Sequence, residues 1–143
     1  MSTIVAGTDG SPGSDRAVAF AASLCKALGA QLVLATAAEP RDTEEMAAFR
    51  RAERATVGDL LEANCDAVLS QAKQVAVRAG AREVAMRRSV GDPTAFILAV
   101  AQDAGAQAIV VGKRGRGRLA GLLVGSVSQK LVSVSSVPVI VVP

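Results

Sequence analysis

Hydrophobic positions follow two different patterns along this chain, and the two patterns alternate. Short runs dominated by Val, Ile, Leu and Ala are typical of buried β-strands, because a strand covered on both faces needs apolar side chains throughout. Longer segments between these runs carry an apolar residue every three or four positions, which predicts helices with one buried face. The predicted strands span residues 3–7, 31–37, 83–90, 108–111 and 137–142. This alternation predicts an α/β fold, an open doubly wound five-stranded parallel sheet with helices on both faces.

Each predicted helix has a recognisable start or stop residue. The first ends at Gly29 and the second at Gly80, a residue type that often terminates helices. Asp92 and Pro93 begin the third as N-cap and first helical residue. The fourth opens at Gly125-Ser126. The predicted buried faces comprise Ala17, Ala21, Leu24, Cys25 and Leu28; Leu61, Cys65, Val68, Ala72, Val75 and Ala79; Phe96, Ile97, Val100 and Ala101; and Val127, Leu131 and Val134.

Two segments depart from the simple alternation. Residues 39–56 mix charges of both signs with weak periodicity, which predicts either a mobile connection or a frayed helix start. Residues 83–90 alternate between apolar and polar side chains, which predicts a strand at a sheet edge. Pro138 lies near the start of the last strand, where a missing N–H is tolerated. No repeat or linker divides the chain, so we expect one domain over residues 1–143.

Composition narrows the range of functions. Half of the 143 residues are apolar but only 2% are aromatic, so the core is expected to consist of Ala, Val, Leu and Ile. The absence of histidine excludes imidazole acid–base chemistry and His-based triads. Cys25 and Cys65 lie on apolar helical faces, so we expect buried, reduced thiols. We find neither a membrane-spanning apolar run nor a secretory signal, and we therefore expect a soluble cytoplasmic protein.

The charges are distributed unevenly around a glycine-rich stretch. The formal net charge is +3, yet the last 40 residues carry +5 and no acid follows Asp103. Within this basic region the strand ending at Val111 runs into Gly112, Lys113 and Arg114, with further glycines at 115, 117, 121 and 125. Glycines let a backbone turn several N–H groups toward one anion, and the helix start at 125–126 adds more donors. This order of strand, glycine loop and helix start predicts a phosphate cradle.

The spacing of these residues resembles a known family. Gly112-x2-Gly115-x9-Gly125-Ser126 is similar to the nucleotide signature of the ATP-binding branch of the universal stress protein family, and Val-Gly-Ser-Val-Ser at 124–128 resembles its closing motif. Val5 to Ser11 resembles the family's opening motif. The resemblance implies the strand order 3-2-1-4-5, which puts the first and fourth strands beside one cleft. The resemblance and the residues themselves together predict a cofactor site formed by Thr8, Asp9, Ala37, Val111, Gly112, Lys113, Gly115, Gly125, Ser126, Val127 and Ser128.

The residues suggest a division of labour within that site. Asp9 suits sugar hydroxyls or an exocyclic amine, whereas the glycine loop and Ser126 suit phosphates, with Lys113 or Arg114 reaching the charge. Asp9 could alternatively be a plain helix N-cap. The spacing fits neither a Walker P-loop nor a dinucleotide GxGxxG turn. Arg116 and Arg118 are expected to be solvated, and without aromatics for base stacking we rank nucleic acid low.

Several functions remain open at this point. The resemblance implies a stress-response protein that binds ATP, alone or together with Mg²⁺, and some relatives prefer cyclic AMP instead. With few groups for catalysis, we favour binding with at most slow hydrolysis over a fast ATPase. A third hypothesis is a protein-interaction dimer with a vestigial nucleotide site. The apolar last strand and the resemblance together predict a homodimer formed through Val137–Val142.

Overall fold

The structure, a computed structural model, describes residues 2–39, 51, 57–114 and 125–143. The predictions for residues 40–50, 52–56 and 115–124, including Gly115, Arg116 and Arg118, therefore lie outside the described residues. The elements in the described part are β1 (Thr3–Gly7), α1 (Pro12–Leu28), β2 (Gln31–Ala38), α3 (Val57–Arg78), β3 (Val84–Val90), α4 (Pro93–Asp103), β4 (Ala108–Gly112), α5 (Ser126–Val134) and β5 (Val139–Val142).

The five strands form one parallel sheet in the order β3-β2-β1-β4-β5, which confirms the predicted α/β fold and strand order. β1 lies at the centre, with Ile4 opposite Leu32 of β2 on one side and Ala108 of β4 on the other. All five residues of β1 are buried. β3 forms one edge of the sheet, as its alternating pattern predicted. The bounds of β1 are as predicted, and those of the other four strands differ by one or two residues; β5 begins at Val139, directly after Pro138.

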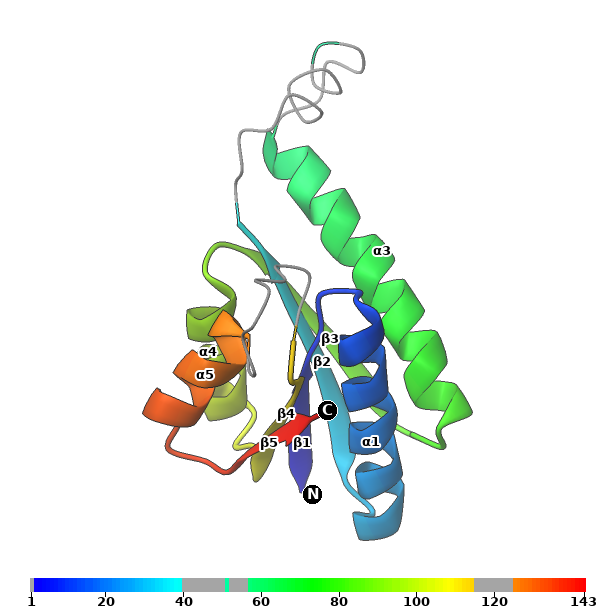
Figure 1. Ribbon diagram of the computed structural model, residues 1–143. Helices are drawn as coiled ribbons and strands as arrows, with labels where there is room; N and C mark the ends of the chain where they lie inside the picture. Colours follow the sequence, from blue (N-terminus) through cyan, green and yellow to red (C-terminus); the bar gives the residue numbers. More distant parts are fainter. Residues whose placement is uncertain (1, 40–50, 52–56, 115–124) are drawn as a thin grey trace.

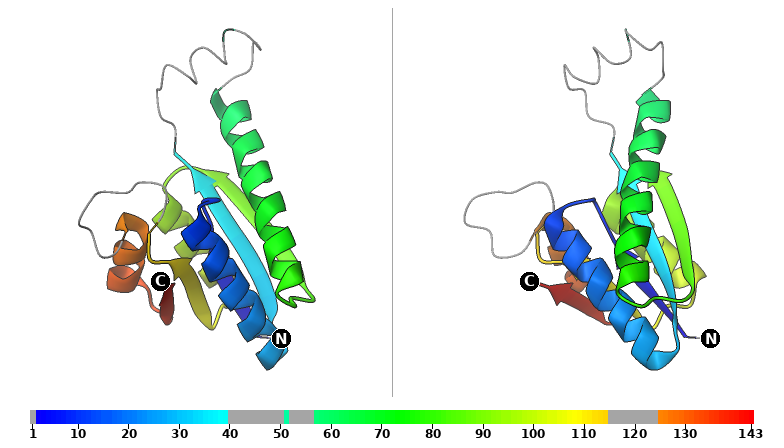
Figure 2. Two further views of the ribbon diagram at one scale, coloured as in Figure 1. Left: turned by 45° about the vertical axis from the view of Figure 1, so that its right-hand side comes forward. Right: turned by 90° about the vertical axis from the view of Figure 1, so that its right-hand side faces the viewer.

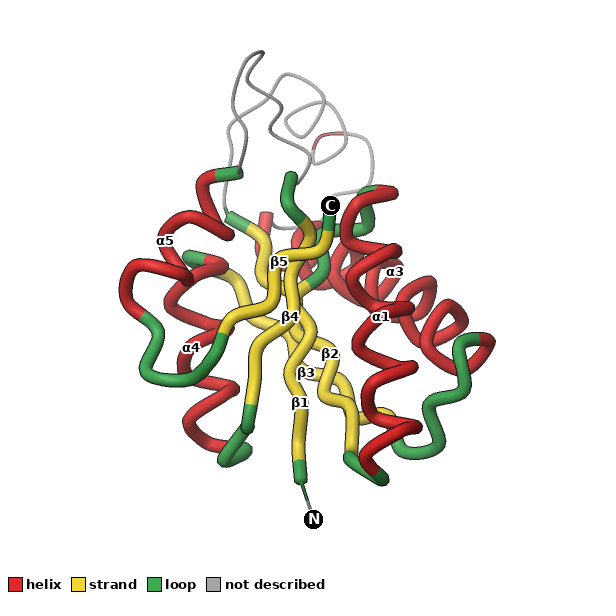
Figure 3. The backbone as a smooth tube through the Cα atoms, turned by 60° about the horizontal axis from the view of Figure 1, so that its bottom comes forward, coloured by secondary structure: helices red, strands yellow, loops and turns green. Residues whose placement is uncertain are grey.

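Helices cover both faces of this sheet. α1 and α3 lie on one side and α4 and α5 on the other (Figures 1 and 3). The α1 side of the core is rich in alanine, because Ala17, Ala21 and Ala22 of α1 are fully buried and let the helix approach the sheet closely. On the opposite side Ile97 of α4 and Leu131 of α5 fill the core. Figure 2 shows the same layering from two further directions.

Helix faces were predicted well in the middle of each helix and less well at the ends. Leu61 and Ala72 are buried on α3, and Val100 on α4, as expected. Leu28 and Val134 were predicted to be buried, but they are 58% and 63% exposed. Each is the last residue of its helix, and the residues just before it are exposed as well. The residues of these final turns face solvent, so periodicity alone overestimates burial there.

Both cysteines are free and buried, which confirms the sequence prediction. Burial raises the pKa of the Cys25 thiol from 9.0 to about 11. Burial likewise raises the pKa of Cys65, with the positive charge of Arg88 acting in the opposite direction. Neither thiol is therefore a ready nucleophile at neutral pH. Among the helices that the structure describes, none has the length and apolar character needed to cross a membrane.

Candidate functional site

The candidate site lies where the direction of winding reverses. From β1 the chain proceeds outward through β2 to β3, then crosses to the other side of β1 to form β4 and β5. Open α/β sheets bind ligands beyond the carboxyl ends of the two strands at such a point. Here these ends are occupied by Thr8 and Asp9 after β1, and by Gly112 and Lys113 at the end of β4. The topology thus brings the two sequence motifs together at the carboxyl ends of the strands.

The turn after β1 is held by its own side chains. Ser11 is the N-cap of α1, and its hydroxyl accepts a hydrogen bond from the Ser14 N–H at 3.2 Å. The Asp9 Oδ1 atom accepts one from the Ser11 N–H at 2.9 Å. Asp9 is therefore not the N-cap of the helix, and the alternative prediction that it caps α1 was wrong. Instead its carboxylate is positioned by the capping residue, and it is only partly buried.

The buried hydroxyl groups of Thr8 and Ser14 stabilise the same turn. The Ser14 hydroxyl donates to the Ser11 carbonyl oxygen at 2.9 Å, and its oxygen lies 3.1 Å from Thr8 Oγ1. Thr8 Oγ1 in turn accepts a hydrogen bond from the Gly10 N–H at 3.3 Å. Thr8 and Ser14 are 7% and 4% exposed. The Thr8 side chain thus holds the turn together, and the partly exposed polar group of this turn is Asp9.

Two glycines bring the turn and the end of β4 into backbone contact. A Cβ atom added to Gly112 would lie 2.8 Å from the carbonyl carbon and oxygen of Gly13, and one added to Gly13 would lie 2.9 Å from the Arg114 carbonyl oxygen. Both distances are too short for real Cβ contacts. The sequence predicted that Gly112 is a glycine so that a ligand can approach. The structure gives another reason, because the first turn of α1 occupies that space. Gly13 was missed by the sequence analysis.

The start of α5 is tied to the same strand end. The Gly125 N–H donates to the Lys113 carbonyl oxygen at 2.7 Å, and the Ser128 hydroxyl donates to the Gly112 carbonyl oxygen at 2.6 Å. Ser128 is 4% exposed, so its side chain anchors the helix to β4. Val127 is partly buried and Ser126 is exposed. Residues 125–128 therefore lie directly beyond β4, as the motif predicted.

The N-terminus of α5 differs from those of α1 and α4. Ser11 caps α1 and Asp92 caps α4, each through a side-chain oxygen that accepts a first-turn N–H. The N-cap of α5 is Gly125, which has no side chain to do so. Among the described residues no N-cap side chain accepts from the first N–H groups of α5, which lie at the positive end of the helix dipole. Lys113 and Arg114 add positive charge close by, and Arg114 is exposed.

The remaining predicted site residues contribute less directly. Val111 is 4% exposed and packs with Ile97 in the core, so its side chain is not open to a ligand. Ala37 lies at the carboxyl end of β2, two residues after Ala35, whose carbonyl oxygen accepts a hydrogen bond from the Thr8 N–H at 3.0 Å. Ala37 is partly buried. The described residues contain no cluster of three or more acidic or cysteine side chains that could hold a metal ion.

Comparison with known proteins shows to which family the chain belongs. A family model described as the universal stress protein family matches residues 1–143. The chain belongs to this family. A universal stress protein of Mycobacterium tuberculosis strain H37Rv is 36% identical over 141 residues, covering 98% of this chain and 94% of the relative. One from Thermus aquaticus is 34% identical over 146 residues, covering 98% and 97%.

Solved structures of universal stress proteins share the fold. A crystal structure of a universal stress protein in complex with cAMP superposes with a TM-score of 0.77 at 32% identity, and the match covers 99% of this chain and 97% of that one. A universal stress protein of Lactobacillus plantarum superposes with a TM-score of 0.80 at 20% identity, covering 99% and 97%. The second match concerns the fold alone.

Proposed function

We propose that this universal stress protein binds an adenine nucleotide beyond the carboxyl ends of β1 and β4, as part of a cytoplasmic stress response. The observation that carries the proposal is the start of α5, an uncapped helix N-terminus held against β4 beside Lys113. Such a terminus is suited to phosphate oxygens. The 32% identical relative that was crystallised with cAMP supports an adenine nucleotide as the ligand class. We propose ATP as the ligand, with cyclic AMP as the alternative.

Different residues of the proposed site would bind the phosphates and the nucleoside. The first-turn N–H groups of α5, the Ser126 hydroxyl and Lys113 would hold the phosphates. Asp9 would accept hydrogen bonds from sugar hydroxyls or from an exocyclic amine, because an ionised carboxylate is a strong acceptor but repels phosphate. Mg²⁺ could accompany ATP, with water filling most of its coordination sphere. We propose binding with at most slow hydrolysis, since Asp9 is the one carboxylate that the described part of the chain places in the motifs.

Asp9→Asn tests the nucleoside half of the site. The asparagine oxygen can still accept the Ser11 N–H, so the turn is expected to persist. Affinity for adenosine is expected to fall about tenfold, because a charge-assisted hydrogen bond becomes a neutral one. Isothermal titration calorimetry with adenosine and ATP measures this loss. Asp103→Asn makes the same change at an exposed position at the end of α4. Equal affinities of wild type and Asp9→Asn would refute the role of Asp9.

We also propose a homodimer formed through β5. β5 is the strand opposite β3 at the other edge of the sheet, and Val139–Val142 carry no charge that would discourage pairing with another chain. Light scattering coupled to size exclusion is expected to give the dimer mass at micromolar concentration. Val141→Lys, which places a charge on this edge, is expected to shift the protein toward monomer. A wild-type protein that stays monomeric would contradict the proposal.

A further inference from the structure

The outer edge of β3 is paired with no strand in the described part of the chain. β3 pairs with β2 alone, and this ladder includes bonds from the Leu32 N–H to the Glu83 carbonyl and from the Gly91 N–H to the Ala38 carbonyl. In a parallel ladder the N–H and C=O of one residue point to the same side, and the side alternates along the strand. The odd-numbered residues therefore face β2. The even-numbered ones, including Met86 and Arg88, face outward.

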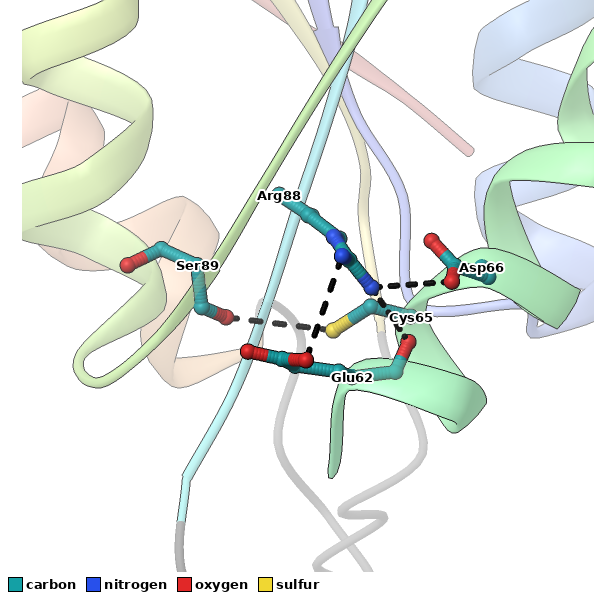
Figure 4. Close-up of polar contacts among 5 residues, drawn as sticks. All are labelled: Glu62, Cys65, Asp66, Arg88 and Ser89. Carbon is teal, nitrogen blue, oxygen red and sulfur yellow. Dashed lines mark hydrogen bonds and ion pairs between the residues drawn. The ribbon is translucent and has the colours of Figure 1, made fainter. Parts of the chain in front are cut away.

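A groove runs along this edge beneath α3. It has a volume of about 450 Å³ and is lined by Asp66, Leu69, Ser70, Lys73, Met86 and Arg88. Its wall is fixed by Arg88, which donates to Asp66 Oδ2 at 2.8 Å and to the Glu62 carbonyl oxygen at 3.1 Å (Figure 4). The Cys65 thiol donates to the Ser89 carbonyl oxygen at 3.8 Å behind this bridge. These contacts join β3 to α3 and hold the two walls of the groove in place.

Apolar side chains are available on the strand itself. Met86 is 40% exposed and Val90 is 41% exposed. Met86 lies on the α3 side of the sheet, where Leu69 forms the opposite wall of the groove. A strand added to this edge would place every second side chain on this side, against Met86 and Leu69. Its intervening side chains would lie on the other side, with Arg87.

The Arg87 side chain lies against the outward-facing backbone of β3. Its guanidinium donates to the carbonyl oxygen of Met86 at 3.0 Å, which is one of the outward-facing backbone groups. A charged side chain on an edge discourages indiscriminate strand pairing. A pairing strand has to displace the guanidinium from this carbonyl, and a carboxylate on that strand would give the guanidinium a stronger acceptor. An acidic strand would therefore pair with this edge more favourably than a neutral or basic one.

The other charges on this surface favour the same partner. Asp66 and Glu62 lie 2.8 Å and 3.9 Å from Arg88, so both acids already have a cation. Among the described residues, neither Lys73 nor Arg87 has a carboxylate partner. A second copy of this chain is a poor occupant, because a full pairing of two β3 strands brings Arg87 and Arg88 of both copies together.

We propose that the free edge of β3 and the adjoining groove bind an extended segment of a partner protein in which apolar and acidic residues alternate. The segment adds a sixth strand to the sheet, its apolar side chains enter the groove, and a carboxylate binds Arg87. This mode of recognition combines backbone hydrogen bonds for affinity with alternate side chains for specificity. It does not depend on the nucleotide site, which lies beyond β1 and β4.

The test uses two blocked peptides, Thr-Val-Glu-Val-Glu-Val-Thr and its counterpart with Lys in place of Glu. Amide NMR of the full chain is expected to show binding of the Glu peptide, with hydrogen-exchange protection appearing at Met86, Arg88 and Val90. Arg87→Glu is expected to weaken this binding about tenfold and to favour the Lys peptide, since attraction becomes repulsion. Lys130→Glu makes the same charge change on α5 and is expected to leave binding unchanged.

Met86→Pro supplies an independent variant. The Met86 N–H faces outward, so proline there removes a donor for the added strand but none from the β2–β3 ladder. This variant is expected to fold and to lose peptide binding. The proposal is overturned if the Glu peptide fails to bind, if Arg87→Glu binds both peptides as wild type does, or if the shifted amides lie on another edge. Edge amides already protected in the free protein by self-association would also overturn it.

Discussion

Gly125→Val is expected to weaken nucleotide binding about a hundredfold or more, which corresponds to about 2.7 kcal/mol. Gly125 has φ −67° and ψ 162°, which valine adopts without strain, so the backbone itself does not oppose the change. The new side chain would stand beside the first N–H groups of α5, in the space proposed for the phosphates. Calorimetric titration with ATP and with cyclic AMP measures the loss.

Gly125→Ala provides the graded control for this experiment. Its single methyl group fills less of the cradle, so its affinity is expected to lie between those of wild type and Gly125→Val. Thermal unfolding of the free proteins is expected to differ little, because the Gly125 N–H can still donate to the Lys113 carbonyl oxygen. Full affinity in the valine variant would refute the assignment of phosphates to the start of α5.

Gly112→Ala is expected to lower the free energy of unfolding by about 2–3 kcal/mol. The added Cβ would lie 2.8 Å from two backbone atoms of Gly13 and 3.1 Å from the Ser14 N atom, and backbone cannot move aside as a flexible side chain can. The strand end and the first turn of α1 must separate, which also displaces Asp9 from the other half of the site. Urea denaturation measures the stability, and calorimetry measures the accompanying loss of nucleotide affinity.

Gly105→Ala is the matched control for this substitution. Gly105 has φ +59° with nothing within 4 Å of an added Cβ, so its cost is backbone strain alone, about 1 kcal/mol. It lies between α4 and β4, at the amino ends of the strands and therefore opposite the proposed nucleotide site, so nucleotide affinity is expected to be unchanged. A Gly112→Ala protein as stable as wild type would contradict the close packing of Gly112 against Gly13.

The sequence predicted the fold well, for physical reasons that operate locally. A strand buried on both faces must be apolar along its length, so β1 was located to the residue from Thr3 to Gly7. The Asp92-Pro93 pair likewise marked the start of α4, where the Asp92 carboxylate accepts the Ala95 N–H at 2.9 Å. The strand order came from the family resemblance, because local periodicity carries no information on which strands are neighbours.

The sequence predicted where the candidate site residues lie relative to the strand ends, but not their detailed contacts. Motif spacing identified Asp9 and Gly125, since both follow directly from strand ends and helix starts. It could not reveal that Gly13 faces Gly112, because the two lie far apart in sequence and meet through the sheet. Nor could it show that the hydroxyl of Ser128 is committed to the Gly112 carbonyl. Such contacts depend on tertiary packing, for which the sequence pattern offers no local signal.

A crystal structure of the chain with ATP tests the central claim most directly. The account predicts phosphate oxygens within hydrogen-bonding distance of the Ser126 and Val127 N–H groups. It also predicts a sugar hydroxyl or the adenine amine at the Asp9 carboxylate, with the first turn of α1 and the end of β4 still in contact through Gly13 and Gly112. A nucleotide bound elsewhere on the protein, or a crevice that remains empty at saturating ATP and cyclic AMP, would contradict it.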